Sequence, residues 1–292
     1  MKIINVEQGS PEWHAWRKTV ITATDCPAIR GSFPISFKKT PYKIWQRKLD
    51  IIKEQKSNYA MDRGKQLEPI IRERFIKKFG IKMSTPCVES SEYEFLGASL
   101  DGLSECWKYM LEIKTGGKEL HDMAEQGIIP DYYMDQMQQQ FLINRKAEKT
   151  FYCVGGEDED SDIVIEVYRD PDFENSYIPV AREFWRCVAF AEPPELQDSD
   201  YKDMSDQEDW QSVAEAYKTV CKQIKEFEEA KERYRQEILD LCGDENCSGN
   251  GIRAKKTPIR GRVDYDSIPE LKTVNLDEYR KKATTSWKVY VA

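Results

Sequence analysis

The sequence predicts an α/β fold, and three observations carry this prediction. Apolar residues recur at helical spacing along residues 60–79 and 131–146. Between these segments, residues 81–115 form short alternating runs that glycine and proline interrupt, as in a sheet. The 292 residues are 40% hydrophobic and 33% charged, which is typical of a soluble globular protein with a sizeable core.

The first elements along the chain are short. Ser10 followed by Pro11 is a helix-start signal, because serine caps a helix and proline suits its first position. We therefore expect a helix over residues 12–17. Residues 20–24 are expected to be extended, and a second helix is expected to begin at Asp25.

Two helices with an apolar face follow, over residues 41–49 and 60–79. Pro69 lies inside the second of them and predicts a kink, and Gly80 is expected to end it. The apolar face of this second helix comprises Leu67, Ile70, Ile71, Phe75 and Phe79.

The strands of residues 81–115 lead into a second group of elements. We expect a helix over residues 131–146, strands over residues 150–155 and 162–168, and a further helix over residues 172–191. Strands that alternate with helices in this way predict a sheet covered by helices.

A change of composition near residue 195 divides the chain. Pro193 and Pro194 begin a polar, acidic linker between a first domain, residues 1–195, and an extension, residues 196–292. The extension is expected to begin with a long helix over residues 210–241 and to continue into a basic tail. We expect the helix to pack within a helical hairpin or onto the first domain, rather than to form an isolated coiled coil. Its narrow apolar seam comprises Val213, Tyr217, Val220, Ile224, Phe227, Tyr234, Ile238 and Leu241.

Composition disfavours several classes of protein. No run reaches the roughly 18 apolar residues that a membrane span needs, and the N-terminus lacks the apolar core of a signal peptide. We therefore expect a cytoplasmic protein without membrane contact, whose eight cysteines are free thiols. The close pair Cys242 and Cys247 is expected to be a loop with two thiols rather than a metal site. Only two histidines are present, which argues against a Ser-His-Asp triad.

The charge balance concerns nucleic-acid binding. The net charge is −8, so the overall field does not attract a polyanion. Clusters of Lys and Arg nevertheless occur within residues 38–48 and 63–78. A basic groove on an acidic body is compatible with both observations.

Two acids and a lysine lie close together around one predicted strand. Glu112 and Lys114 alternate with Leu111 and Ile113, so the charged pair shares one face while the apolar pair enters the core. Asp101 lies at a predicted turn, from which the chain can return beside Glu112. Converging carboxylates hold Mg²⁺, which lowers the pKa of a bound water, and a neighbouring lysine positions that water. From spacing alone, a surface hairpin with an ion pair is the alternative.

Several short motifs occur in one order along residues 1–190. Together they resemble the lambda-exonuclease branch of the PD-(D/E)xK nuclease superfamily, the YqaJ-type viral recombinases. The resemblance implies a central mixed sheet flanked by helices, with a C-terminal helical extension and a small tail. The motifs are Glu7-Gln8-Gly9 with Trp13, Trp16, Arg17 and residues 20–24, Arg63-Gly64-Lys65 leading to Glu68, Ser99-Leu100-Asp101-Gly102, Glu112-Ile113-Lys114, and Tyr133-Met134-Asp135-Gln136-Met137-Gln138.

The resemblance also implies roles for the matching residues. Asp101, Glu112 and Glu68 would hold Mg²⁺ or Mn²⁺, and Lys114 would act on the attacking water. One glutamine would assist; we expect Gln136, with Gln138 as the reserve, because residues two apart on a helix do not share a face. The expected catalytic residues are Glu68, Asp101, Glu112, Lys114, Gln136 and Gln138. The residues expected to bind a DNA 5′-phosphate are Arg17, Thr24, Ser99 and Lys118, with Thr24 in place of the usual serine.

By the same resemblance, the protein would be a magnesium-dependent exonuclease of a phage or mobile-element recombination system. It would digest double-stranded DNA from a 5′ end and leave 3′ single strands. It would form a homo-oligomer, often a trimeric ring, and work with a single-strand annealing protein. The alternatives are a structure-dependent endonuclease on the same core and a non-cutting DNA-binding or assembly module. An iron–sulfur nuclease is disfavoured because the cysteines lack a four-ligand arrangement.

Overall fold

The computed structural model describes the chain except for residues 53–58, 159–160, 258–267 and 269–292. It divides into two compact units, Met1–Lys202 and Asp203–Ala292. The boundary lies a few residues beyond the one we expected between the first domain and the extension.

A five-stranded mixed sheet forms the centre of the first unit. Its strand order is β3-β6-β7-β8-β9. Strands β7 and β8 are parallel, because two helices connect them, and the other neighbours are antiparallel. The strands are β3 (Met83–Ser84), β6 (Gly102–Ser104), β7 (Tyr109–Lys114), β8 (Lys149–Val154) and β9 (Ile163–Val167). The predicted central mixed sheet is therefore confirmed.

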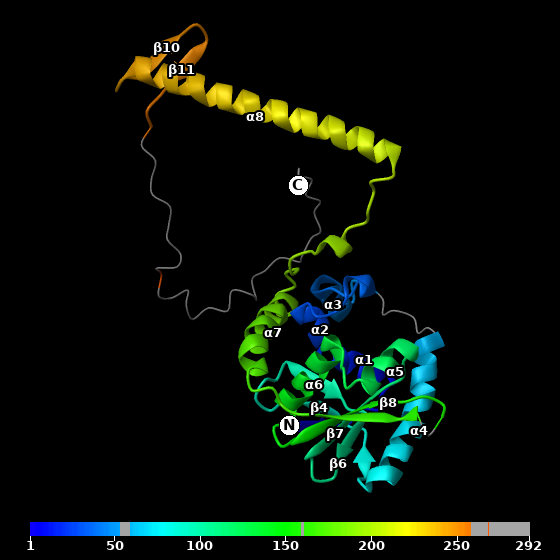
Figure 1. Ribbon diagram of the computed structural model, residues 1–292. Coiled ribbons are helices and arrows are strands. Elements are labelled where there is room, and N and C mark those ends of the chain that lie inside the picture. The colour runs from blue at the N-terminus through cyan, green and yellow to red at the C-terminus, as the bar shows by residue number, and fades with distance from the viewer. Residues whose placement is uncertain (53–58, 159–160, 258–267, 269–292) are drawn as a thin grey trace. The chain divides into compact units, whose positions relative to one another are not determined.

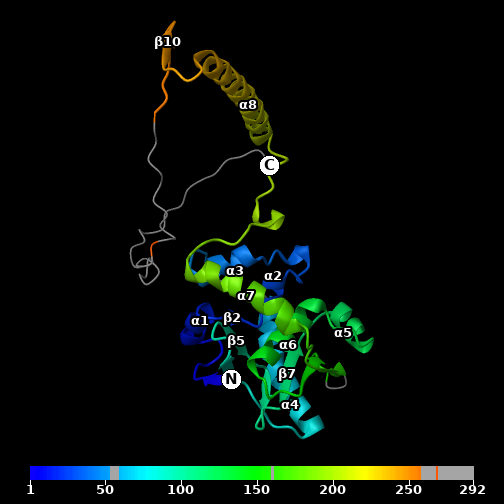
Figure 2. The ribbon, with the colours of Figure 1, turned by 90° about the vertical axis from the view of Figure 1, so that its left-hand side faces the viewer.

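A second sheet of four short strands lies at the N-terminal side of the unit, in the order β1-β4-β5-β2. Figure 2 shows β2 and β5 beside α1 (Pro11–Lys18). Strand β2 pairs in parallel with β5, with Ile21 opposite Leu96 and Thr22 opposite Gly97. The strands are β1 (Lys2–Ile4), β2 (Ile21–Thr22), β4 (Cys87–Glu89) and β5 (Leu96–Ser99).

Helices cover both faces of the five-stranded sheet (Figure 1). On one face, α4 (Tyr59–Phe79) packs through Leu67, Ile71 and Phe75 against side chains of β7 and β8. On the other face lies α6 (Asp131–Ile143), whose Met137 and Phe141 belong to the main core. Behind α6 lie α2 (Cys26–Arg30), α3 (Pro41–Lys48) and α7 (Phe173–Ala189), and α5 (Lys118–Glu125) contacts β8 and β9.

The predicted start of the first helix is confirmed. Helix α1 begins at Pro11, and the hydroxyl of Ser10 accepts a hydrogen bond from the amide of Trp13 at 3.1 Å. Helix α6 ends at Ile143, three residues earlier than we expected. No helix within the described residues is long and apolar enough to cross a membrane.

The second unit contains α8 (Glu208–Cys242) and a hairpin of β10 (Cys247–Gly249) and β11 (Ile252–Ala254). Within the described residues, a β-hairpin follows α8, and the expected packing of α8 within a helical hairpin or onto the first domain stays a prediction. No residue of α8 is buried, and its apolar seam is exposed over most of its length. The expected tail residues Arg260 and Arg262, and the strand-like run at residues 286–291, lie outside the described residues.

Candidate active site

Glu112 and Lys114 lie side by side on β7, on the face that α6 covers. Leu111 and Ile113 point to the opposite face and pack against α4, as the alternation predicted. Glu112 is 1% exposed, and the ammonium of Lys114 donates to its carboxylate. A carboxylate buried to this extent requires such partners to offset the loss of hydration.

Two glutamines of α6 complete the surroundings of Glu112. The amide of Gln136 donates to Glu112 Oε1 at 2.6 Å, and its carbonyl accepts from Lys114 at 3.2 Å. One helical turn later, the amide of Gln140 donates to Glu112 Oε2 at 2.6 Å. Both oxygens of the carboxylate are therefore held in position, and its charge is shared among three donors.

Asp101 joins this group through the turn between β5 and β6. Strand β6 returns antiparallel to β7, with Gly102 opposite Leu111. The backbone amide of Ile113 consequently donates to Asp101 Oδ2 at 2.8 Å. The predicted return of the chain thus places the Asp101 side chain against the strand that carries Glu112.

Glu68 reaches the same place from α4. Arg72 lies one turn farther along this helix, and its guanidinium donates to Glu68 Oε1 at 3.1 Å. The same nitrogen donates to the backbone carbonyl of Asp101 at 2.8 Å. We call Glu68, Asp101 and Glu112 the acidic cluster.

The acidic cluster and Lys114 change each other's proton affinity. Burial raises the pKa of Asp101 well above its usual range, and the charges of Glu112 and Glu68 raise it further, while Lys114 opposes them. Burial by itself would lower the pKa of Lys114, but the carboxylates of Glu112 and Asp101 raise it above its ordinary value. Lys114 is therefore an ammonium at neutral pH, a donor of protons in hydrogen bonds rather than a base.

The acidic cluster fits a divalent cation by the chemistry of its donors. Mg²⁺ takes oxygen ligands and retains several waters, so two or three carboxylates suffice. Burial is the main cause of the raised pKa of Asp101, and repulsion by Glu112 and Glu68 adds to it; a cation would relieve this repulsion. In this structure, Arg72 and Lys114 hold Glu68 and Glu112. Among the described residues, another group of possible metal ligands lies at the surface of α5. It comprises His121, Asp122 and Glu125, whose ligand atoms all lie within 4.8 Å of one another.

A second polar group lies where α1 and β2 meet β5. Arg17 Nη2 donates to Thr24 Oγ1 at 3.2 Å, and its guanidinium lies 4.4 Å from the centre of the Trp13 ring. The indole of Trp13 in turn donates to Ser99 Oγ at 2.8 Å. We call Trp13, Arg17, Thr24 and Ser99 the Arg17 cluster.

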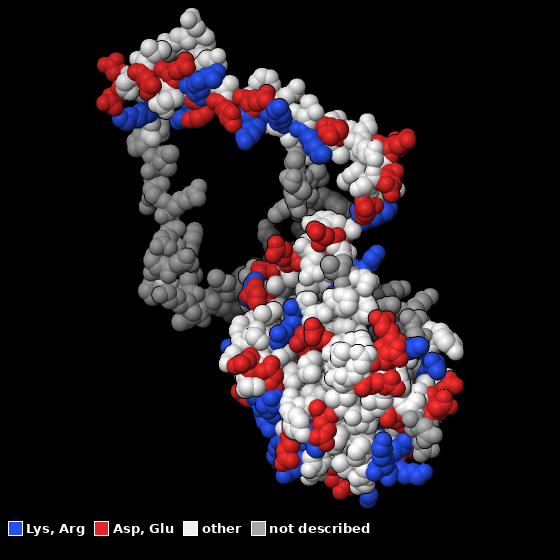
Figure 3. All heavy atoms as spheres, in the orientation of Figure 1, with Lys and Arg blue, Asp and Glu red and all other residues white. Residues whose placement is uncertain are grey.

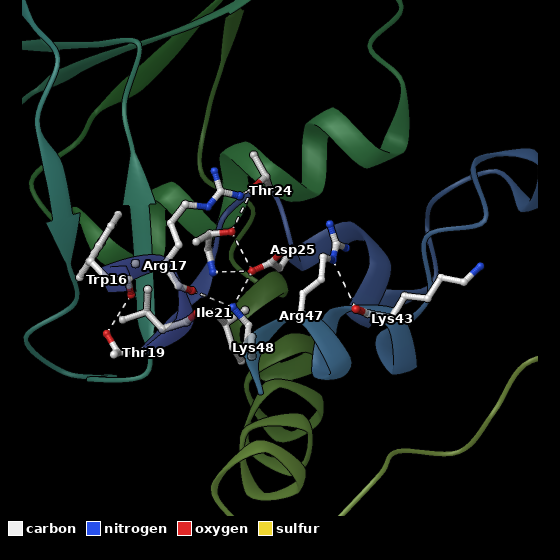
Figure 4. Close-up of polar contacts among 12 residues, drawn as sticks. Trp16, Arg17, Thr19, Ile21, Thr24, Asp25, Lys43, Arg47 and Lys48 are labelled. Atoms are coloured by element: carbon white, nitrogen blue, oxygen red, sulfur yellow. Dashed lines mark hydrogen bonds and ion pairs between the residues drawn. The ribbon is translucent and has the colours of Figure 1, made fainter. Parts of the chain in front are cut away.

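A buried ion pair between Asp25 and Lys48 lies next to the Arg17 cluster (Figure 4). Lys48 donates to Asp25 Oδ2 at 2.9 Å and to the backbone carbonyls of Arg17 and Val20. Asp25 also accepts from the amide and the hydroxyl of Thr22, at 3.1 and 2.8 Å. Burial would raise the pKa of Asp25, but Lys48 and then Arg17 lower it below its usual range.

Comparison with known proteins identifies a related family and a related fold. Residues 12–147, which include the acidic cluster, Lys114 and all of α6, match the family described as the YqaJ-like viral recombinase domain. The match covers a little less than half of the chain. The family resemblance that the sequence motifs predicted is thereby confirmed.

Two solved structures have a fold similar to that of this chain. The crystal structure of LHK-Exo in complex with dAMP is 22% identical, with a TM-score of 0.54, and the match covers 63% of this chain and 94% of that one. A second structure, of the alkaline exonuclease LHK-Exo from Laribacter hongkongensis, is 21% identical over the same shares, with a TM-score of 0.53. No curated protein sequence matches the chain. The domain family and its acidic cluster support a nuclease.

Two residues that the motifs suggested lie outside these clusters in the YqaJ-like domain. Gln138 is directed away from Glu112, because two residues turn an α-helix by more than half a revolution; its side chain instead bonds the backbone of Tyr168 and Asp170. Lys118 is the first residue of α5 and is exposed. Within the described residues, no hydrogen bond links Lys118 to Arg17, Thr24 or Ser99.

Sequence reasoning missed Gln140 and the pair of Asp25 and Lys48. The spacing of Gln140, four residues after Gln136, is a signal that would have placed it on the same face of α6. Asp25 and Lys48 offer no such signal, because they are 23 residues apart on different helices and meet only in the folded chain.

One cavity lies between Thr24 of the Arg17 cluster and the two residues, Lys114 and Gln136, that bond Glu112 of the acidic cluster. Its volume is about 170 Å³, and its wall includes Thr24 from the Arg17 cluster as well as Lys114 and Gln136 beside the acidic cluster. The remaining wall residues are Phe33, Phe37, Lys39, Tyr132 and Tyr133. A single small ligand in this cavity would touch Thr24 as well as Lys114 and Gln136.

Proposed function

We propose that the protein is a divalent-metal-dependent deoxyribonuclease that removes nucleotides from the 5′ ends of double-stranded DNA. The observation that carries the proposal is the cavity shared by Thr24, Lys114 and Gln136, because it joins a hydrolytic group to a phosphate-binding group. LHK-Exo, which has this fold, was crystallised with dAMP, a nucleoside monophosphate. Binding of a nucleoside monophosphate by a protein of this fold supports the proposal that this chain releases nucleotides from DNA.

The hydrolytic half of the proposed reaction belongs to the acidic cluster. A bound Mg²⁺ or Mn²⁺ would supply an activated water and offset negative charge on the phosphate. Asp101 and Glu112 would hold the ion, with Glu68 as a further ligand. Gln136 and Gln140 fix the orientation of Glu112, since each donates to one of its oxygens at 2.6 Å.

We assign to Lys114 the direct contact with the attacking water and with the phosphate. The carboxylates of Glu112 and Asp101 raise the pKa of Lys114 and so favour the ammonium form, which we do not assign as the general base. It would instead donate hydrogen bonds to the attacking water and to the phosphate oxygen on which charge develops. The ring of Tyr133 lies 4.7 Å from the Lys114 ammonium and limits its movement.

The Arg17 cluster would bind the 5′-phosphate of the DNA end. A guanidinium and hydroxyl groups are suited to a phosphate, because they offer directed donors and one positive charge. Lys39 and Arg47 add positive charge on the same side, since both neighbour the Asp25–Lys48 pair in electrostatic range. On the face seen in Figure 3, acidic and basic side chains are interspersed. Because the net charge of the protein is −8, its overall field does not attract DNA, and we propose that the attraction is local to this cavity.

We further propose the setting that the family suggests. The enzyme would act in phage or mobile-element recombination in the cytoplasm, leave 3′ single strands, and pass them to a single-strand annealing protein. It would be a homo-oligomer, with a trimeric ring as the expected form.

Digestion of linear duplex DNA with Mg²⁺ tests the proposal. We would compare 5′-phosphorylated, 5′-hydroxyl and covalently closed substrates, and use Lys114→Ala and Lys118→Ala as a matched pair. The expected result is loss of the open, 5′-phosphorylated duplex, abolished by Lys114→Ala and retained by Lys118→Ala. Cutting of the closed circle would instead identify an endonuclease. DNA binding without any cutting would identify a binding or assembly module.

A further inference from the structure

Three aromatic side chains in the cavity wall have no part in the proposed hydrolysis. Phe33 and Tyr132 are stacked, with ring centres 5.5 Å apart and planes at 28°. Phe37 meets the Tyr132 ring edge-on at 5.4 Å and the Phe33 ring at 5.7 Å. We call Phe33, Phe37 and Tyr132 the aromatic wall.

The aromatic wall is built by two elements that also shape the site. Phe37 ends a short 3-10 helix, Ile35–Phe37, which comes after α2, and Tyr132 lies in the first turn of α6, four residues before Gln136. Phe37 is 46% exposed, and Phe33 and Tyr132 are half-buried. The three rings pack on one another, and Phe33 also packs against the main core and Tyr132 against Tyr133. All three rings line the cavity.

Positive charge accompanies the aromatic wall. The ammonium of Lys39 lies 4.6 Å from the centre of the Phe33 ring. The pKa of Lys39 is lowered, first by burial and next by Arg47, with smaller contributions from Lys114 and Arg17. Two cationic side chains, Lys39 and Lys114, line the cavity, and Arg47 and Arg17 lie within electrostatic range of Lys39, where Asp25 offsets part of their effect. This excess of positive charge favours an anion there.

This combination of planar rings and cations points to one class of ligand. Apolar ligands would gain from the rings but not from the cations, and free phosphate would gain from the cations alone. A nucleotide uses both, because a base stacks on aromatic side chains while its phosphate meets Lys or Arg. The cavity of about 170 Å³ has room for a single base.

We propose that the aromatic wall is a stacking site for one unpaired nucleobase at the DNA end, next to the phosphodiester that is cut. The inference rests on the proposed function, since it places a nucleotide in the cavity of Lys114 and Gln136. It adds a requirement for an unpaired base, so a duplex end must open before its terminal nucleotide enters. Stacking is tolerant of sequence, so all four bases are accepted.

Fluorescence of 2-aminopurine at the 5′ terminus of a duplex tests the stacking site, because stacking on an aromatic ring quenches this base. The measurement uses the full chain with EDTA present, so that binding is seen without cleavage. We expect quenching on binding by the wild-type protein, and loss of quenching with about five- to 100-fold weaker binding in Phe37→Leu. Tyr132→Leu is a second variant with the same expected result. Tyr168→Leu removes an exposed ring that does not line the cavity and is the control.

The outcomes separate the two proposals. Wild-type cleavage of 5′-phosphorylated duplex with Mg²⁺, together with unchanged quenching in both Phe37→Leu and Tyr132→Leu, would overturn the stacking site and leave the nuclease intact. Binding without quenching in the wild-type protein would overturn it as well. A wild-type protein that neither binds nor cuts DNA would overturn both. Circular dichroism of each variant checks that the fold is retained, which we expect for the exposed Phe37.

Discussion

The buried ion pair of Asp25 and Lys48 holds the backbone beside the Arg17 cluster, because Lys48 also donates to the carbonyl of Arg17. Removing one partner leaves a buried charge unpaired, which costs about 3–5 kcal/mol. We therefore expect Asp25→Asn to lower the free energy of unfolding in urea by about this amount. Asp50→Asn is the matched control, because the exposed pair of Asp50 with Lys18 contributes less than about 1 kcal/mol. Equal, small effects of the two substitutions would contradict the prediction.

The same pair predicts how stability depends on pH. The pKa of Asp25 is lower in the folded chain than in the unfolded chain, where it is about 3.9. A lowered pKa stabilises the fold above the unfolded value, and this contribution is lost as the pH falls towards the folded value. The difference in unfolding free energy between the wild-type protein and Asp25→Asn should be constant from pH 7 to 5 and shrink from pH 4 to 2. Urea unfolding at these pH values measures it; a difference that grows in acid would refute the assignment.

Gln136 and Gln138 give a test within one helix. Gln136 donates to Glu112, whereas Gln138 bonds the backbone of residues 168 and 170. Loss of a side chain that orients a metal ligand costs about 10- to 100-fold in activity or metal affinity. We expect this loss of kcat for Gln136→Leu and a much smaller loss for Gln138→Leu, measured with linear duplex DNA and a titration of Mg²⁺. The reverse order would place the wrong glutamine at the site.

For single residues, the sequence predicts those parts of the site whose positions depend on one strand or one turn. Asp101, Glu112 and Lys114 come together because alternation on β7 and the turn before β6 are local features. The choice of Gln136 over Gln138 also follows from helix geometry alone. The partners of Asp25 and Arg72 are set by contacts between separate elements, so spacing along the chain does not reveal them.

Among the elements, the parallel pairing of β2 with β5 brings Thr24 near Ser99, and it depends on a close approach at Gly97. A Cβ at this position would lie 2.7 Å from Val20 Cγ2 and 3.0 Å from the Trp16 ring. We expect Gly97→Ala to destabilise the fold by about 1–3 kcal/mol, because the neighbours are buried and cannot move freely. Gly117→Ala is the control, since a Cβ there meets nothing within 4 Å. Thermal unfolding of both variants measures the difference, and equal midpoints would argue against the close packing.

The order and type of most elements in the first unit could be predicted from periodicity, and the ends of α1 and α4 from their capping and stop residues. The division of the strands between two sheets could not, because strand pairing is a long-range property that alternation does not encode. For α8, periodicity predicted the helix and its apolar seam. What packs on this seam stays a prediction, because a seam shows that one face of a helix is apolar but does not identify its partner.

For the molecule as a whole, all residues of the acidic cluster, the Arg17 cluster and the aromatic wall lie in the first unit. We predict that a chain ending at Lys202 folds cooperatively by itself and binds Mg²⁺ as the full chain does, because its core is complete without the second unit. Urea unfolding and calorimetric titration with Mg²⁺ measure this. A truncated chain that lacks a cooperative transition would show that the second unit is part of the fold.

The central position of β7 in the sheet determines how often the backbone of the site opens to solvent. Strand β7 has hydrogen-bonded neighbours on both sides, β6 and β8, and helices cover both of its faces. Its backbone amides can exchange with solvent deuterium only when the sheet itself opens, which requires nearly the full free energy of unfolding. The strand that carries Glu112 and Lys114 should therefore be among the last segments to exchange, and the hydrolytic groups should keep their arrangement while DNA ends enter and leave.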